Sequence, residues 1–142
     1  MRFKMISEVH LILRRGGRLL LSKRANTGYM DGYYSLVAGH VDGGEPFRAA
    51  MAREALEEVG LVLDPEALRV AHLMHRMSDS ERVSLFFEVD DWAGEPVNAE
   101  PEKCDGLIWV RPDELPDNMV PYVATALGFV AQGVTYSEYG WP

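Results

Sequence analysis

The sequence predicts an α/β (α+β) fold, with strands interleaved with two helices in a single domain covering residues 1–142. Its 142 residues suffice for one hydrophobic core. The hydrophobic fraction of 47% and the charged fraction of 25% are typical of globular proteins. Short apolar runs bounded by glycine and proline alternate with segments of helical periodicity.

The N-terminal part predicts a β-hairpin. Apolar residues 9–13 and 19–21 flank a turn that contains Gly16 and Gly17. A loop rich in glycine and tyrosine is expected over residues 27–34. A short apolar run follows at residues 36–38.

The spacing then predicts a helix over residues 47–59. Pro46 suits a first helical turn, where its missing N–H is not needed. Gly60 suits the position just beyond a helix end. Ala52, Leu56 and Val59 recur at helical spacing and are expected to form the buried stripe.

The second half predicts three strands, a loop and a helix. The strands are expected at residues 68–74, 83–89 and 107–110, the loop at 91–104, and the helix at 120–132. The tail from residue 135 to 142 is aromatic and polar, and its pattern indicates no element.

Composition excludes several classes of protein. Lys and Arg total 14 against 22 for Asp and Glu, a net charge of −8 that repels nucleic acids and anionic membranes. No apolar run approaches the roughly 18 residues of a membrane span, and no export signal is recognisable. Cys104 is the only cysteine, so no intrachain disulfide can form. We expect a cytoplasmic protein with a small-molecule partner, and the sequence leaves open whether it forms a homodimer.

Three carboxylates are the strongest chemical signal. Glu54, Glu57 and Glu58 stand at i, i+3 and i+4, which places them on one face of the helix, opposite the expected stripe and pointing out of the core. Their mutual repulsion favours a hard cation such as Mg²⁺, which prefers oxygen ligands and retains waters for substrate phosphates. Arg53 could orient a carboxylate. A solvated acidic surface is the structural alternative.

The surrounding spacing distinguishes these two interpretations. Gly39, Glu45, Arg53, Glu54, Glu57, Glu58 and Gly60 occur in the pattern G-x5-E-x7-R-E-U-x-E-E-x-G-U, where U is apolar. This segment resembles the box of the Nudix family (MutT-like members). Ala55 stands where the family usually has a larger aliphatic residue, a departure that affects packing more than chemistry.

The resemblance implies a Nudix-type α/β/α sandwich with a mixed β-sheet between helices, and a divalent metal cofactor, Mg²⁺, for which Mn²⁺ may substitute. By position, Glu57 and Glu58 would bind the metal, with Glu54 as a ligand or general base. The carbonyl of Gly39 would be a further ligand. Arg53 and Glu45 would orient the cluster. A glutamate at the position of Glu100, in the loop after residue 91, would complete the metal site or act as the base.

Residues outside the box are candidates for substrate binding. Arg24 could contact phosphates or be an exposed cation at a strand end, and His40 could border the phosphates. Asn98 and Asp105 could bind a base edge, although both residue types are common in turns. The aromatic candidates for base stacking, which pack equally well in a core, are Tyr33, Tyr34, Trp92 and Trp109.

The predicted reaction is hydrolysis of a diphosphate linkage in a nucleotide. Such chemistry needs positioning, charge neutralisation by metal and a carboxylate base. Family markers for ADP-ribose or dinucleotide substrates are absent at Arg76-Met77-Ser78, so a nucleoside triphosphate, such as one with an oxidised purine, is the default. The rivals are an ADP-ribose or dinucleotide hydrolase, a non-catalytic nucleotide sensor, and a structural domain. No P-loop motif occurs, and structural roles are expected for His72, His75 and Cys104.

Overall fold

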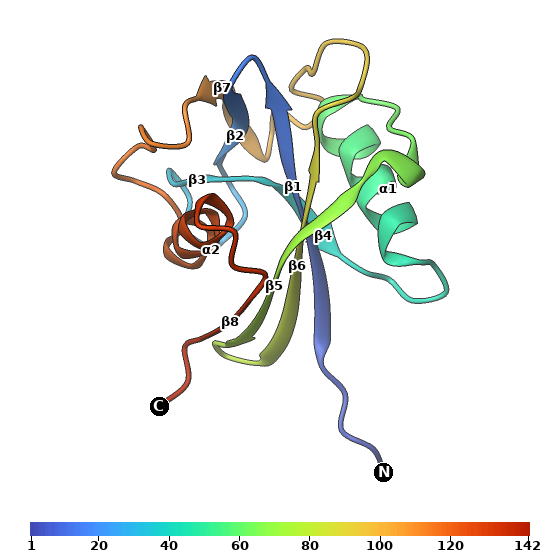
Figure 1. Cartoon of the computed structure of the whole chain (residues 1–142), viewed down its shortest axis with the longest axis vertical. Coiled ribbons are helices and arrows are strands. Elements are labelled where there is room, and N and C mark those ends of the chain that lie inside the picture. The colour runs from blue at the N-terminus through green and yellow to red at the C-terminus, as the bar shows by residue number, and fades with distance from the viewer.

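A computed structural model describes residues 1–142. Its centre is a mixed sheet whose longest path runs β3-β2-β1-β6-β5-β8, with β4 paired to β1 and β7 paired to β2. Strands β1 and β6 run parallel, as do β5 and β8, and the other pairs are antiparallel. Figure 1 shows α1 and α2 on opposite sides of the sheet, so the predicted α/β/α sandwich is confirmed.

The N-terminal strands follow the predicted hairpin. Strand β1 spans Ile6–Arg15 and β2 spans Arg18–Arg24, with a turn at Gly16 and Gly17, where φ is 59° and 76°. Residues with a side chain rarely adopt such positive φ values, which explains why both positions are glycine. The loop that follows leads to β3 (Tyr34–Ser35) and β4 (Val37–His40).

Helix α1 spans Phe47–Val59, as predicted. Pro46 is the N-cap residue, one position earlier than expected. Gly60 closes the helix in the left-handed conformation, with φ of 71°, and donates its N–H to the carbonyl of Leu56.

The expected buried stripe of α1 is wrong in part. Leu56 is 52% exposed, whereas the buried residues of the helix are Ala50, Met51, Ala55 and Val59. The helix is rotated so that Glu54 and Glu58 face the sheet edge instead of pointing out to solvent. Ala55 is fully buried in the apolar cluster under the helix, where its small side chain allows the helix to approach the sheet.

The remaining elements complete both layers. A short 3-10 helix at Pro65–Ala67 precedes β5 (Arg69–Met77), which forms a hairpin with β6 (Glu81–Val89). Strand β7 spans Cys104–Val110 and α2 spans Pro121–Ala131. The unassigned tail contains β8 (Tyr136–Tyr139), a parallel neighbour of β5.

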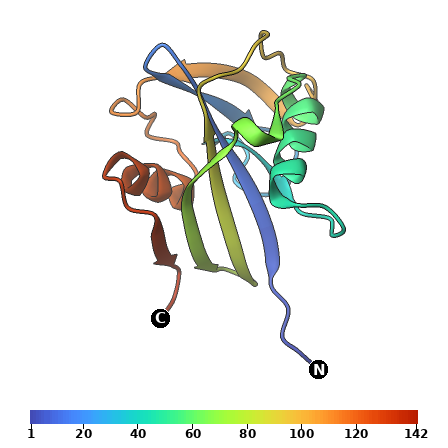
Figure 2. The same ribbon diagram turned by 45° about the vertical axis from the view of Figure 1, so that its right-hand side comes forward.

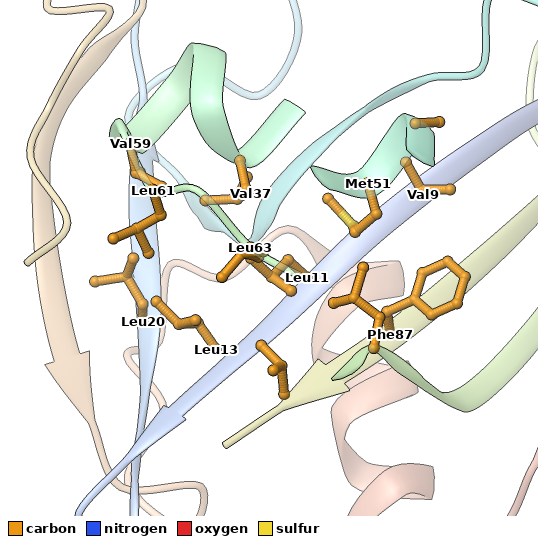
Figure 3. Close-up of a cluster of buried hydrophobic side chains, with 14 of the residues drawn as sticks. Val9, Leu11, Leu13, Leu20, Val37, Met51, Val59, Leu61, Leu63 and Phe87 are labelled. Carbon is orange, nitrogen blue, oxygen red and sulfur yellow. The ribbon is translucent and has the colours of Figure 1, made fainter. Parts of the chain in front are cut away.

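Two apolar clusters fill the spaces between the layers. One lies under α1, where Met51 and Val59 contact side chains from β1, β2, β4 and β6 (Figure 3). The other lies under α2 and includes Ile12, Phe86 and Val123. Figure 2, turned from the first view, also shows α1 and α2 on opposite sides of the strands. None of the helices is both long enough and apolar enough to cross a membrane.

The histidines have the structural roles expected from the sequence. His72 is fully buried, and its ring contacts the Val134 carbonyl at 2.8 Å and the Ser137 hydroxyl at 2.7 Å. His75 contacts Glu81 at 2.8 Å. The His72 contacts tie the tail to β5, and the His75 contact joins β5 to β6.

Candidate active site

Helix α1 lies against β4 because Gly39 has no side chain. A Cβ atom at Gly39 would overlap the carboxyl group of Glu54, so any larger residue would displace that group. The backbone N–H of Ala38, the neighbouring residue in β4, lies near Glu58 and acts to lower the pKa of its carboxyl group. The glycine of the motif therefore permits the close approach that brings two carboxyl groups of α1 onto the sheet edge.

The loop before β7 adds a further glutamate. The N–H groups of Val97 and Ala99 donate to the carbonyls of Val59 and Glu58, at 3.0 and 3.1 Å. This docking on the C-terminal end of α1 brings Glu100 to the same cavity as Glu54, Glu57 and Glu58. The cavity has a volume of about 330 Å³.

Arg53 connects the acidic groups. Its guanidinium donates to Glu45 at 2.7 and 3.2 Å and to Glu54 at 2.9 Å, and lies 3.5 Å from Glu57. It also donates to the backbone carbonyl of His40 at 3.3 Å. A planar group with several fixed donors holds carboxylates in defined orientations. Arg53 and Glu45 are thus placed to orient the cluster.

Glu58 has an unfavourable environment for a carboxylate. Burial, a hydrogen bond with Glu54 and the charges of Glu54 and Glu100 raise the pKa of Glu58 to about 9. Burial also raises the pKa of Glu54, against the opposing effect of Arg53. The Oε2 atom of Glu58 is buried and has no hydrogen-bond partner. Such a carboxyl group is costly to ionise unless a cation binds it.

The residues present fit a divalent cation. The donors are all carboxylate or carbonyl oxygens, as a hard cation requires, and the orphaned oxygen of Glu58 lies among them. The side chains do not converge as a preformed cage of three acidic or soft ligands. Mg²⁺ needs only one or two protein carboxylates together with waters and substrate phosphates.

The predicted substrate residues have different surroundings. Arg24 borders the carboxylate cavity, and its guanidinium is held by the Tyr29 carbonyl at 2.7 Å and the Thr27 hydroxyl at 3.0 Å. His40 lines a neighbouring cavity. Asn98 borders neither: its amide donates to the Cys104 carbonyl at 2.7 Å and its oxygen accepts from the N–H of Glu100 at 3.2 Å. Asn98 therefore shapes the loop that carries Glu100.

The aromatic candidates take packing positions. The rings of Trp92 and Trp109 stack at 6.1 Å, with the guanidinium of Arg15 over Trp109 at 4.4 Å. Neither these rings nor Tyr33, Tyr34 or Asp105 border the two cavities.

Lys103 borders both cavities, although the sequence pattern did not identify it as a site residue. The one feature of the sequence that connects Lys103 with the site is its position three residues after Glu100. The sequence pattern also did not identify Glu8, Arg76 and Arg82, which come from separate strands and meet only in the folded sheet.

Acidic groups of one helix and one loop line a cavity at this sheet edge, an arrangement that suits metal-assisted hydrolysis. Comparison with known proteins agrees. Residues 5–127 match the NUDIX domain model. The chain therefore belongs to the Nudix family, as the sequence motif predicts.

Individual relatives extend this result. The chain is 26% identical over 118 residues to an 8-oxo-dGTP diphosphatase of Escherichia coli (strain K12), covering 82% of this chain and 91% of the relative. It is 29% identical over 106 residues to an NAD-capped RNA hydrolase, NudC, of Stutzerimonas stutzeri (strain A1501), covering 75% of this chain but only 36% of that protein.

Among solved structures, a MutT NUDIX hydrolase from Burkholderia pseudomallei superposes with a TM-score of 0.80 at 26% identity, covering 89% of this chain and 98% of that chain.

Proposed function

We propose that this protein is a divalent-metal-dependent pyrophosphohydrolase that cleaves a nucleoside triphosphate, such as one with an oxidised purine, to the monophosphate and pyrophosphate. The observation that carries this proposal is the buried carboxyl of Glu58, which lies beside Glu54 and Glu100 with one oxygen unpartnered. The similarity to an 8-oxo-dGTP diphosphatase supports the choice of substrate.

The carboxylate cluster would hold the metal. Glu54, Glu57, Glu58, Glu100 and the carbonyl of Gly39 supply the candidate oxygens. We propose Mg²⁺ as the ion, with Mn²⁺ as a substitute, since both are hard cations that accept oxygen ligands. A divalent ion held by these groups would neutralise phosphate charge and supply an activated water molecule as the nucleophile.

The chain's own groups provide positioning and proton transfer. Arg53 fixes the carboxyl of Glu54 from one side, and β4 supports Glu58 from the other. Glu54 or Glu100 accepts the proton of the attacking water, because both border the cavity. Glu54 is paired with Arg53, whereas Glu100 has no arginine partner. Arg24, at the same cavity, is placed to bind a phosphate oxygen.

We also propose a cytoplasmic location and a free nucleotide, rather than a nucleic acid, as substrate. The net charge of −8 opposes binding to an extended phosphate backbone.

A dinucleotide hydrolase is the second candidate function. It is favoured by a further cavity of about 750 Å³ next to the carboxylate cavity, which offers room for a second nucleoside. The similarity to an NAD-capped RNA hydrolase points the same way.

A nucleotide panel tests the proposal. Purified protein is incubated with Mg²⁺ and canonical triphosphates, oxidised triphosphates, ADP-ribose, diadenosine polyphosphates or NADH, and the products are separated. Monophosphate and pyrophosphate from a triphosphate are the expected result. Efficient cleavage of a dinucleotide alone would support the second candidate. Nucleotide binding without any product would contradict both and favour a sensor.

A further inference from the structure

The larger cavity lies directly beside the carboxylate cavity. It has a volume of about 750 Å³ and is formed by β1, β4, β5, β6, α2 and the loops before β3 and β7. Arg24, Ala38 and Lys103 border both cavities. A ligand with its diphosphate at the carboxylates can therefore extend into this second space.

We propose that this cavity, called here the anion cavity, binds a second anionic group of the substrate, a phosphate separate from the diphosphate that is cleaved. The proposal rests on the proposed function for the position of the cleaved linkage. It extends the substrate class beyond simple triphosphates, to diphosphates that carry an additional phosphate on the part of the molecule beyond the cleaved bond.

The charge of the anion cavity is opposite to that of the whole chain. Its ionised lining groups are four cations, Arg24, Arg76, Arg82 and Lys103, and two carboxylates, Glu8 and Asp79. The difference is an excess of two positive charges, in a protein with a net charge of −8, and it lies at Arg24 and Lys103 on the boundary with the carboxylate cavity. A local excess of this sign attracts phosphate groups.

The carboxylates in the anion cavity are already occupied. One oxygen of Glu8 accepts from Arg76 and from Ser84, both at 2.7 Å, and the other accepts from Arg82 at 2.9 Å. Asp79 accepts from Ser78 at 3.0 Å and from Arg82 at 3.1 Å. Few acceptor positions remain for a ligand that donates hydrogen bonds.

Donors, in contrast, remain available. Lys103 forms no ion pair, and the hydrogen bonds of the Arg24 guanidinium go to uncharged oxygens of Tyr29 and Thr27. The Nε atom of Arg82 is buried and has no partner. A buried donor without a partner is costly, and a ligand oxygen would remove that cost. The free polar groups thus suit a ligand rich in acceptors.

The aromatic rings of the cavity are engaged by arginines. The guanidinium of Arg76 lies 3.7 Å from the ring centre of Tyr122, and that of Arg24 lies 5.3 Å from the ring centre of Tyr29. An uncharged base could stack on these rings only by displacing the arginine side chains. This arrangement favours an anionic group over a stacked base in the anion cavity, and it therefore counts against the second nucleoside of the dinucleotide candidate.

Lys103 is fixed at the boundary between the two cavities. Its N–H donates to the carbonyl of Glu100 at 2.9 Å, and its own carbonyl accepts from the N–H of Ala25 at 3.0 Å. Lys103 is thereby held between the Glu100 turn and the end of β2 that carries Arg24. A ligand that spans both cavities therefore lies within reach of Lys103, as it does of Arg24.

Calorimetric titration tests the proposal with two matched pairs of probes. Coenzyme A differs from dephospho-coenzyme A, and NADPH from NADH, by one phosphate on a ribose. Titrations use the full chain with Ca²⁺ in place of Mg²⁺ to limit turnover. We expect at least one phosphorylated member to bind about tenfold more tightly than its partner, as one charge-assisted contact provides.

Variants of the exposed Lys103 and of the half-buried Lys23 locate the effect. Lys103→Gln is expected to abolish the preference and Lys103→Arg to retain it. Lys23→Gln is the matched control, because it removes the same charge from a residue that borders neither cavity. Equal affinity within both pairs, no binding of any probe, or a preference that survives Lys103→Gln would overturn the proposal.

The two proposals fail separately. Discrimination in binding without hydrolysis of any diphosphate would retain the anion cavity and reject the enzymatic function. Hydrolysis of triphosphates without discrimination between the paired probes would retain the enzymatic function and reject the anion cavity.

Discussion

Substitution of Glu58 by glutamine separates a metal-binding role from a structural one. Glutamine has nearly the same shape as the protonated carboxyl and can still donate a hydrogen bond to Glu54. It removes the charge for which burial, Glu54 and Glu100 raise the pKa to about 9. Without metal, we expect Glu58→Gln to be more stable than the wild type.

The magnitude follows from the pKa. In the unfolded chain the carboxyl ionises near 4.5, so at pH 7 the folded state holds a proton that the unfolded state has released. At about 1.4 kcal/mol per pH unit, this difference costs the wild type up to about 3 kcal/mol at pH 7. We therefore expect Glu58→Gln to gain on the order of 1–3 kcal/mol. For a chain of this size, that corresponds to a rise in Tm of roughly 3–10 °C.

The difference in stability between Glu58→Gln and the wild type should depend on pH. Because the pKa of Glu58 is higher in the folded state, the stability of the wild type falls as pH rises from 4.5 towards 9. The advantage of Glu58→Gln should therefore disappear as pH is lowered to 4.5, where both states hold the proton.

Thermal melts with chelator and with Mg²⁺ provide the assay. The wild type should gain Tm with Mg²⁺, whereas Glu58→Gln should gain little and lose Mg²⁺-dependent turnover. Glu66→Gln, an exposed residue remote from the cavity, controls for the change in net charge. The reasoning is refuted if Glu58→Gln melts well below the wild type in chelator, or if its response to Mg²⁺ is unchanged.

Further variants test other parts of the site. Gly39→Ala should fold, because only the end of the flexible Glu54 side chain is obstructed, but kcat should fall at least tenfold; unchanged kcat would contradict the close-approach argument. Arg53→Lys should lower kcat by about 10–100-fold with a smaller effect on KM, because an ammonium cannot hold Glu45 and Glu54 together, and steady-state kinetics would show this. Ala55→Leu should destabilise the chain by about 1–3 kcal/mol in denaturant titrations through overpacking; a stable variant would show that the site has room. Burial opposes ionisation of Glu8, yet His10, Ser84 and Arg76 lower its pKa to about 2. The stability that the Glu8 carboxylate contributes above pH 4.5 should therefore be lost as pH falls towards 2, and Glu8→Gln should flatten this part of the curve of stability against pH.

Local signals in the sequence predicted much of this structure. The helix at Phe47–Val59 has its ends marked by Pro46 and Gly60, and β1 and β2 are separated by paired glycines in the turn. These features depend on the backbone preferences of neighbouring residues, so the sequence carries them directly.

Other features depend on contacts between distant segments. The rotation of α1 follows from the packing of Met51, Ala55 and Val59 on the sheet, whereas the helical pattern alone pointed to Leu56 as buried. Gly39 leaves room for Glu54 at the sheet edge. Strand β8 has little apolar character and forms because β5 offers an edge and His72 fixes the tail. The Glu8–Arg76–Arg82 group is assembled from three strands, and no local spacing reveals it.

The most direct test of the account is a crystal structure with Mn²⁺ and a non-hydrolysable triphosphate analogue, with the metal located by anomalous scattering. We predict a peak within coordination distance of Glu57 or Glu58 that is shared with the oxygens of the analogue. A peak elsewhere, or ordered analogue at this cavity with no metal beside the glutamates, would contradict the central claim.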